Sequence, residues 1–308
     1  MKIKIGTRGS KLALWQAYYV RDRLAKDGID SEIITIETKG DKILDVTISK
    51  IGSKGVFTEE IEEQLQSGHI DIAVHSAKDM PSSLPKGFEL IAFSEREKAH
   101  DVLVSHKTID LNQKDLVLGT SSTRRIAFLQ KHFPHVKTVA VRGNLQTRIN
   151  KMKDGVCDAL WLAYAGAHRM EYDDMIVHEF DEKEFVPAVG QGSIAIEVFE
   201  NISEDKKIAV RKAINNVEAE TCLIAERSFL AVMNGGCSIP VFGRAFIEHE
   251  ALTLRGGIIS LDGQTQVSKT CSCTLNAASK AGQTLAEYVL DHGGKEILDE
   301  IRKQQAID

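Results

Sequence analysis

The chain has 308 residues, of which 43% are hydrophobic and 27% are charged. This composition is ordinary for a folded globular protein and argues against overall disorder, and the length suggests two or three domains. The formal net charge is −5, from 39 Lys and Arg against 44 Asp and Glu. That balance disfavours a protein that binds nucleic acid through a broadly basic surface.

The N-terminal residues and the cysteines indicate where the protein works. No apolar signal segment follows the opening residues, and the longest nearly apolar stretch, 159–167, is too short to span a bilayer. The five cysteines are scattered and odd in number, which suits a reducing compartment better than a disulfide framework. We therefore expect a cytoplasmic protein without membrane contact. We also expect no metal and no nucleic-acid partner, and nothing in the sequence suggests more than a monomer.

Strands and helices alternate from the N-terminus onward, as in an α/β domain. The expected strands of this first lobe are 2–7, 32–38, 70–75 and 88–94. Ser10 and Thr58 are good N-caps for its two expected helices, which Gly28 and Gly68 end.

The middle of the chain repeats this alternation and predicts a second lobe. Its expected strands are 116–119, 137–141, 159–163 and 193–198, and its expected helices are 123–132 and 145–153. The end of the chain differs, because a long helix at 218–233 precedes an antiparallel meander and a last helix at 277–290. The strands of that meander are expected at 241–247, 251–259 and 265–274. The expected fold is α/β, with two lobes and a small α+β C-terminal domain.

Two turns share one pattern, in which a strand leads through Gly-Thr, hydroxyl and Arg residues into a helix. They span 6–10 and 119–125. Free N–H groups at a helix N-terminus attract anions, and arginine matches a carboxylate or phosphate. A single such turn is explained by simple helix capping. The pair predicts an anionic ligand held between the two lobes.

Further arginines follow the expected strand ends, where α/β sheets bind ligands. The full set is Arg8, Arg124, Arg125, Arg142, Arg148 and Arg169. So many guanidinium groups predict a ligand with several carboxylates or phosphates, with solvated surface arginines as the alternative.

Two loops carry candidate reactive groups. Asp79 follows Lys78 in a loop after a buried strand, and its carboxylate suits proton transfer or stabilisation of a cation; a plain turn aspartate is the alternative. His75 is expected to be structural rather than catalytic. Cys237, after two glycines, is a candidate attachment point or nucleophile, with a buried inert thiol as the alternative.

Taken together, the motifs resemble the porphobilinogen deaminase (hydroxymethylbilane synthase) family over essentially the whole chain. They are highly specific in this order. The motifs are GTRGSKLALWQA (6–17), KGVFTEEIE (54–62), DIAVHSAKDMP (71–81), LGTSSTRR (118–125), VRGNLQTR (141–148), AGAHR (165–169), VGQG (189–192), AER (225–227) and GGCSIP (235–240).

The resemblance implies a transferase of tetrapyrrole and haem biosynthesis. Such an enzyme joins four porphobilinogen molecules head to tail into hydroxymethylbilane and releases ammonia at each addition. The resemblance also implies a dipyrromethane cofactor, attached to Cys237 through a thioether, that primes the growing chain. Asp79 matches the catalytic aspartate, which suits the cation left when ammonia departs.

The resemblance further implies binding roles for named positions. The cofactor-binding positions are Ser76, Lys78, Thr120, Ser122, Arg124 and Arg125. The substrate-binding positions are Arg8, Ser10, Lys50, Lys54, Arg142, Arg148, Arg169 and Gln191. The acetate and propionate groups of each pyrrole match the many arginines.

The implied fold has two doubly wound lobes like those of type II periplasmic binding proteins. Domain 1 is expected to be discontinuous, at 1–95 and 192–214. Domain 2 is expected at 96–191. Domain 3, which carries the attachment loop, is expected at 215–308.

Two other function classes stay open. A two-lobed anion-binding protein without catalysis accounts for the arginines but not for the Gly-Gly-Cys loop. An enzyme acting on phosphorylated substrates would use the same helix N-termini, but the sequence contains no GxxxxGK[ST] or GxGxxG phosphate loop.

Overall fold

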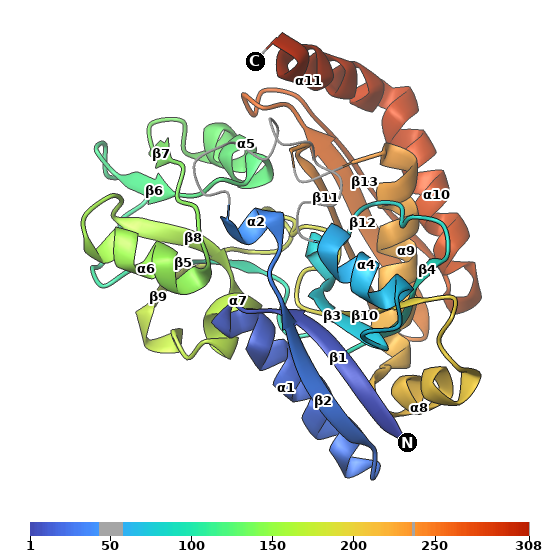
Figure 1. The fold of residues 1–308 in the computed structure, drawn as a ribbon. Coiled ribbons are helices and arrows are strands. Elements are labelled where there is room, and N and C mark those ends of the chain that lie inside the picture. The colour runs from blue at the N-terminus through green and yellow to red at the C-terminus, as the bar shows by residue number, and fades with distance from the viewer. Residues whose placement is uncertain (43–57, 236–237, 308) are drawn as a thin grey trace. The chain divides into compact units, whose positions relative to one another are not determined.

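The computed structural model describes residues 1–42, 58–235 and 238–307 (Figure 1). The chain forms two compact units. Unit 1 comprises Met1–Glu97 and Gly192–Glu220, and unit 2 comprises Lys98–Gln191 and Thr221–Asp308. No helix in the described part of the chain combines the length and the apolar character that a membrane span requires.

Unit 1 is built on a five-stranded sheet with the order β2-β1-β3-β10-β4. The strands are β1 (Lys2–Arg8), β2 (Asp30–Ile36), β3 (Ile72–Ser76), β4 (Phe88–Phe93) and β10 (Ile194–Phe199). β1 runs parallel to β2 and β3, whereas β10 runs antiparallel to β3 and β4. A strand from the later chain segment therefore completes the sheet of the first lobe.

Helices cover both faces of this sheet. They are α1 (Lys11–Lys26) and α8 (Glu204–Ile214) on one face and α4 (Glu59–Gln66) on the other. A short helix, α2 (Lys39–Lys42), follows β2. Alternate residues of β3 point to opposite faces. Ile72 and Val74 join the core formed with α1 and α8, while Ala73 joins Ile61 and Leu65 of α4.

The first part of unit 2 has a second five-stranded sheet, with the order β7-β6-β8-β5-β9. Its strands are β5 (Asp101–Val104), β6 (Val117–Gly119), β7 (Lys137–Val139), β8 (Ala159–Ala163) and β9 (Ile176–Glu179). β6 is parallel to β7 and β8, and β5 is antiparallel to β8 and β9. The two sheets thus share one strand pattern. The helices are α5 (Thr123–His132), α6 (Leu145–Lys153) and α7 (Tyr164–Arg169).

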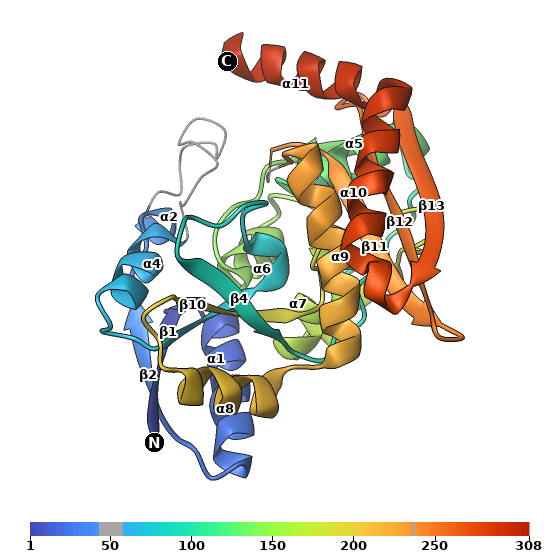
Figure 2. The same ribbon diagram turned by 90° about the vertical axis from the view of Figure 1, so that its right-hand side faces the viewer.

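The C-terminal part of unit 2 is a three-stranded antiparallel sheet with long helices packed beside it (Figure 2). The strands are β11 (Val241–Glu248), β12 (Ala251–Ile259) and β13 (Gln266–Thr274). The helical segments are α9 (Val217–Met233), α10 (Ala278–Val289), η4 (Leu290–Gly294) and α11 (Lys295–Ile307). Phe229 of α9 and Leu285 of α10 pack with Leu252 and Leu254 of the sheet.

The expected α/β class and the α+β C-terminal domain are confirmed, while β5, β9, α2, α7, α8 and α11 were not predicted. The strand predicted at 193–198 is wrong in its place, because it belongs to unit 1 as β10 and not to the second lobe. β5 and β9 have four residues each, too few to show a clear period. The last predicted helix does not end the fold. The backbone kinks at Gly293, where φ is +107°, and continues into α11. Thr58 precedes α4 as predicted, but its side chain makes no capping hydrogen bond.

Gly119, at the end of β6, provides a test of packing at the second Gly-Thr turn. A Cβ there would lie 2.7 Å from Cys157 Sγ and 2.8 Å from Val141 Cγ2. We expect Gly119→Ala to lower the free energy of unfolding by about 1–3 kcal/mol because the core is overpacked. Urea unfolding measures the change. Gly9→Ala is the matched control, since its Cβ meets no atom within 4 Å; equal losses in the two variants would contradict the packing argument.

Candidate active site

In unit 1 several predicted residues lie at the carboxyl ends of β1 and β3, which are parallel neighbours and so end on the same side of the sheet. Arg8 ends β1, and Ser10 caps α1 by accepting a hydrogen bond from the N–H of Ala13 at 3.3 Å. Ser76 ends β3, and its hydroxyl accepts a 2.8 Å hydrogen bond from Nε2 of Gln16 on α1. This bond connects α1 to the end of β3.

Asp79 lies at the end of η1 (Ala77–Asp79), a single 3₁₀ turn that follows β3. Its side chain is exposed, whereas Lys78 is half-buried and Met80 is buried. The N–H of Ala77 donates to Ser193 O of the adjoining segment at 2.9 Å. The loop therefore holds an exposed carboxylate on a fixed backbone.

A buried pair lies beneath this loop. Nε2 of His75 lies 3.0 Å from Oε2 of Glu197 on β10, and both side chains are buried. Glu62 of α4 lies on the same face of the sheet, and burial raises the pKa of its carboxyl group. The burial of this pair fits the structural role expected of His75, which stays a prediction. Its partner Glu197 was not predicted, because the pairing joins strands more than one hundred residues apart.

In unit 2 the carboxyl ends of β6, β7 and β8 also meet at one edge, since these strands are parallel. Thr120 follows β6, and its Oγ1 accepts a hydrogen bond from the N–H of Ser122 at 3.2 Å. Arg142 follows β7 and is half-buried, and Arg169 ends α7 and is buried. Arg148 donates from Nε to Gly143 O at 2.8 Å. The edge is therefore rich in guanidinium groups.

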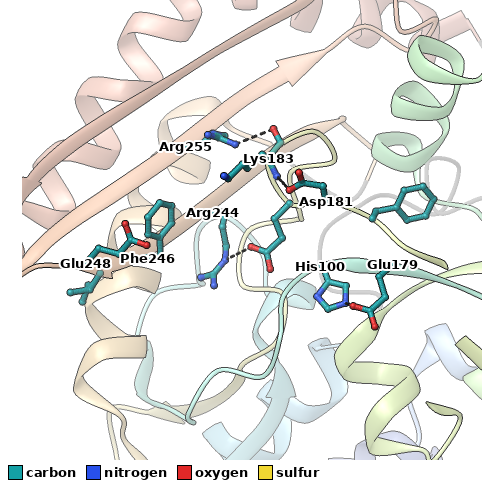
Figure 3. Close-up of a pocket in the computed structure, with 11 residues that line it drawn as sticks. His100, Glu179, Asp181, Lys183, Arg244, Phe246, Glu248 and Arg255 are labelled. Carbon is teal, nitrogen blue, oxygen red and sulfur yellow. Dashed lines mark hydrogen bonds and ion pairs between the residues drawn. The ribbon is translucent and has the colours of Figure 1, made fainter. Parts of the chain in front are cut away.

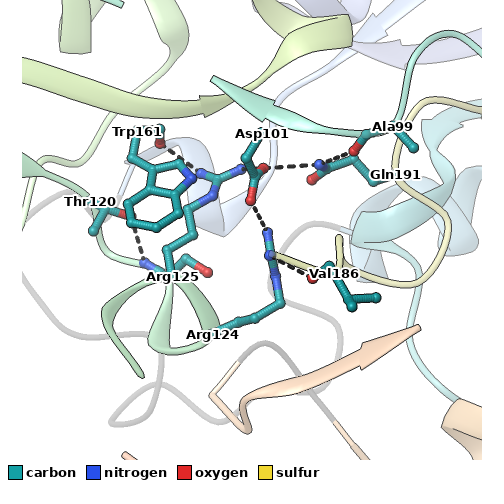
Figure 4. Close-up of polar contacts among 9 residues, drawn as sticks. Ala99, Asp101, Thr120, Arg124, Arg125, Trp161, Val186 and Gln191 are labelled. Atoms are coloured by element: carbon teal, nitrogen blue, oxygen red, sulfur yellow. Dashed lines mark hydrogen bonds and ion pairs between the residues drawn. The ribbon is translucent and has the colours of Figure 1, made fainter. Parts of the chain in front are cut away.

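Arg124 and Arg125, in the first turn of α5, both contact one buried carboxylate (Figure 4). Nη2 of Arg124 donates to Oδ2 of Asp101 at 2.7 Å, and Nη2 of Arg125 donates to Oδ1 at 2.8 Å. Nη1 of each arginine donates to a backbone carbonyl, Val186 O at 2.9 Å and Trp161 O at 2.7 Å respectively. These bonds fix both guanidinium planes.

Gln191 is the fourth member of this buried cluster of Asp101, Arg124, Arg125 and Gln191, which we call the arginine node. Its Nε2 donates to Oδ1 of Asp101 at 2.9 Å and to Ala99 O at 2.6 Å, and its side chain is buried. The predicted positions Arg124, Arg125 and Gln191 are thus brought together around Asp101.

The charges of the node are unequal. Burial alone would raise the pKa of Asp101, but the two guanidinium groups outweigh it and hold that pKa well below the usual range. Burial lowers the pKa of Arg124, and Asp101 opposes this shift. One carboxylate against two guanidinium groups leaves one positive charge in excess. Nε of Arg125 is buried and has no hydrogen-bond partner among the described residues. The node therefore fits an additional anionic group.

Asp101 was not singled out from the sequence, which gave Arg124 and Arg125 either ligand contacts or solvated positions and did not predict that they are buried against a carboxylate. It opens β5, the short strand that was not predicted. An acidic residue directly before the apolar run Val102-Leu103-Val104 is the one local signal. The partners lie more than twenty residues away, so no local pattern connects them.

Three predicted positions lie outside the described residues. They are Lys50, Lys54 and Cys237. Within the described residues there is no group of three His, Cys, Asp or Glu side chains that could hold a metal ion.

A surface hollow of about 590 Å³ in unit 2 contains none of the predicted site residues (Figure 3). Four acidic side chains line it, those of Glu179, Asp181, Glu182 and Glu248. Nε2 of His100 lies 3.0 Å from Oε2 of Glu179, and Nε of Arg244 donates to Oε2 of Glu182 at 3.0 Å. The Lys and Arg side chains of the lining are three, Lys183, Arg244 and Arg255, so the hollow has no excess of cationic groups and is not the cationic site that the sequence predicts.

Comparison with known families gives two matches that together span most of the chain. Residues 3–208 match the model described as "Porphobilinogen deaminase, dipyromethane cofactor binding domain". Residues 220–291 match "Porphobilinogen deaminase, C-terminal domain".

Individual relatives agree with these matches. The porphobilinogen deaminase of Desulfosudis oleivorans is 54% identical and aligns over 99% of this chain and 99% of its own. That of Cytophaga hutchinsonii is 52% identical over 98% of this chain and 97% of its own. Among solved structures, the methionine-binding protein MetQ aligns with 69% of this chain and 89% of its own, with a TM-score of 0.45 and 13% identity.

Replacing the central carboxylate tests the charge balance of the node. Asp101→Asn leaves two buried guanidinium groups facing a neutral amide. We expect the free energy of unfolding near neutral pH to fall by about 3–5 kcal/mol. Urea unfolding measures it, with Asp115→Asn as the control, because the Asp115 side chain is 89% exposed. A loss no larger than that of the control would contradict the account.

The difference in the free energy of unfolding between wild type and Asp101→Asn should also depend on pH. The pKa of Asp101 is lower in the folded chain than the unfolded value of about 3.9. Its carboxylate therefore stabilises the fold above that pH, and this contribution is lost as the pH falls below it. The stability difference between wild type and Asp101→Asn is expected to narrow on acidification below about pH 4. A difference that stays constant or widens there would show that the guanidinium groups do not lower this pKa.

Proposed function

Because the chain belongs to the porphobilinogen deaminase family, we propose that it is a transferase that joins four porphobilinogen molecules head to tail into hydroxymethylbilane, releasing ammonia at each addition. The observation that best supports this activity is the guanidinium-rich edge of unit 2, whose central node carries one positive charge more than Asp101 neutralises. A pyrrole chain that gains an acetate and a propionate with every unit needs such cations.

The dipyrromethane cofactor of the family is proposed to be attached to Cys237, between α9 and β11. When bound, this group supplies the terminal pyrrole to which the first substrate is joined. Arg124 and Arg125 offer it fixed guanidinium groups, and the unpartnered Nε of Arg125 is a donor directed by the same plane. The further proposed contacts are Ser76, Lys78, Thr120 and Ser122.

Substrate carboxylates are proposed to bind the remaining cationic and polar positions. These are Arg8, Ser10, Lys50, Lys54, Arg142, Arg148, Arg169 and Gln191. Guanidinium groups suit this task, because their planar donors bind a carboxylate through two parallel hydrogen bonds.

Asp79 is proposed as the catalytic carboxylate. Loss of ammonia from porphobilinogen leaves an electron-poor cation, which a carboxylate stabilises and from which it can move protons. The exposed side chain of Asp79 on a fixed backbone supports this role, because substrate can reach the carboxylate while its position is held.

The proposal includes the organisation of the chain. We propose domain 1 at 1–95 and 192–214, domain 2 at 96–191 and domain 3 at 215–308, in a cytoplasmic monomer. The substrate is a small molecule, porphobilinogen.

The catalytic role is tested by Asp79→Asn, which keeps the size of the side chain and removes its charge. We expect kcat to fall by about 10²-fold or more, because both cation stabilisation and proton transfer are lost. Product formation from porphobilinogen measures it. Asp22→Asn is the control, an exposed aspartate on α1 of the same unit. Ordinary turnover by Asp79→Asn would exclude the catalytic role.

Attachment of the cofactor is tested by Cys237→Ser. A hydroxyl is a much weaker nucleophile than a thiol, so we expect no stable two-pyrrole adduct. Cys273→Ser, a change in β13, should leave the adduct in place. Mass spectrometry of the denatured variants distinguishes them. A covalent dipyrromethane on the Cys237→Ser chain would refute the assignment.

A further inference from the structure

Glu226 of α9 is a fully buried carboxylate within the Ala-Glu-Arg motif, to which no role in the reaction was assigned. Each of its oxygens accepts a short hydrogen bond from a backbone N–H. Oε2 accepts from Gly190 at 2.8 Å, and Oε1 accepts from Ala245 at 2.7 Å. One side chain thus joins α9 to two segments that are distant in the sequence.

The two segments also contact each other. β11 lies at an edge of its sheet, so part of its backbone faces no strand. The segment 187–190 lies along that edge, where the N–H of Gly243 donates to Pro187 O at 3.1 Å. A Cβ on Gly243 would lie 3.1 Å from Val189 Cγ2. Glu226 therefore closes a packed junction of α9, β11 and this segment.

Two parts of the proposed site are next to this junction in the sequence, Gln191 and the segment that contains Cys237. Residue 190 precedes Gln191, whose amide contacts Asp101 in the arginine node. α9 ends at Met233 and β11 begins at Val241. Residues 234–240, which include Cys237, connect the two elements that Glu226 clamps, and we term them the attachment loop.

We propose that Glu226 is a positioning residue that fixes the two ends of the attachment loop, Met233 of α9 and Val241 of β11, relative to the Gln191–Asp101 node and thereby speeds cofactor attachment. This inference rests on the proposed function. Two hydrogen bonds from backbone N–H groups to one ionised carboxylate are strong and directional, which suits a clamp better than apolar packing does.

The test is the rate of cofactor attachment in Glu226→Gln. The variant has nearly the same shape, but its amide nitrogen must face one of the two N–H donors. Wild-type and variant apoproteins are incubated with porphobilinogen, and the intact mass of the denatured chain follows the gain of two linked pyrrole units. Glu218→Gln is the control, an exposed glutamate in the first turn of the same helix.

We expect attachment to Glu226→Gln to be about tenfold slower, as loss of one buried charge-assisted hydrogen bond implies, with the control at the wild-type rate. Hydrogen exchange on the apoproteins gives a second readout, and the amides of Gly190 and Ala245 should exchange faster in the variant. Circular dichroism at the assay temperature checks that the variant is folded, so that general instability does not account for the slower rate.

The outcomes separate the two proposals. If wild type gains no pyrrole mass, the proposed function fails. If wild type loads and folded Glu226→Gln loads equally fast, the function stands and the positioning role of Glu226 is overturned. Should Glu226→Gln not fold, Glu226→Asp replaces it. That carboxylate keeps its charge but is too short to reach both N–H groups, so wild-type loading by this variant would overturn the role as well.

Discussion

The pairing of one buried carboxylate with two buried guanidinium groups organises the cationic edge of unit 2. Asp101 opens β5, and Arg124 and Arg125 reach it from the first turn of α5. Without the carboxylate, two like charges would be buried side by side, which is strongly unfavourable. With it, the guanidinium planes are fixed against Val186 O and Trp161 O. The site is therefore preorganised before any ligand binds.

That arrangement also leaves a positive charge in the node that fits the proposed binding of anionic groups. One negative charge cannot neutralise two positive ones, and the surplus is held in a region of low dielectric where electrostatic attraction is strong. In unit 1 the proposed catalytic carboxylate is held in the opposite way. Asp79 is exposed while its backbone is held by the Ala77–Ser193 hydrogen bond. Buried partners thus fix the cationic groups, whereas a backbone hydrogen bond of the same loop holds the proposed catalytic carboxylate in place.

Local signals in the sequence were sufficient for most of the framework. Gly119 could be read as part of a tight strand-to-helix turn, and its neighbours leave no room for a side chain. Ser10 was recognisable as a cap, and its hydroxyl does accept from Ala13. Short buried strands such as β5 were missed, because four residues show no periodicity. The contacts of Asp101, Glu197 and Glu226 could not be predicted from local patterns, because the partners of each lie far along the chain. Glu226 was noted only as part of the AER motif.

The central claim is that the chain carries a covalent dipyrromethane on Cys237 and extends it with porphobilinogen. The most direct test is the intact mass of the purified wild-type protein under denaturing conditions, with a fragment map of residues 234–240. The account predicts an added mass of two linked pyrrole units on the peptide that contains Cys237. A chain that is unmodified, and that forms neither adduct nor tetrapyrrole when porphobilinogen is added, would contradict it and favour a two-lobed anion-binding protein.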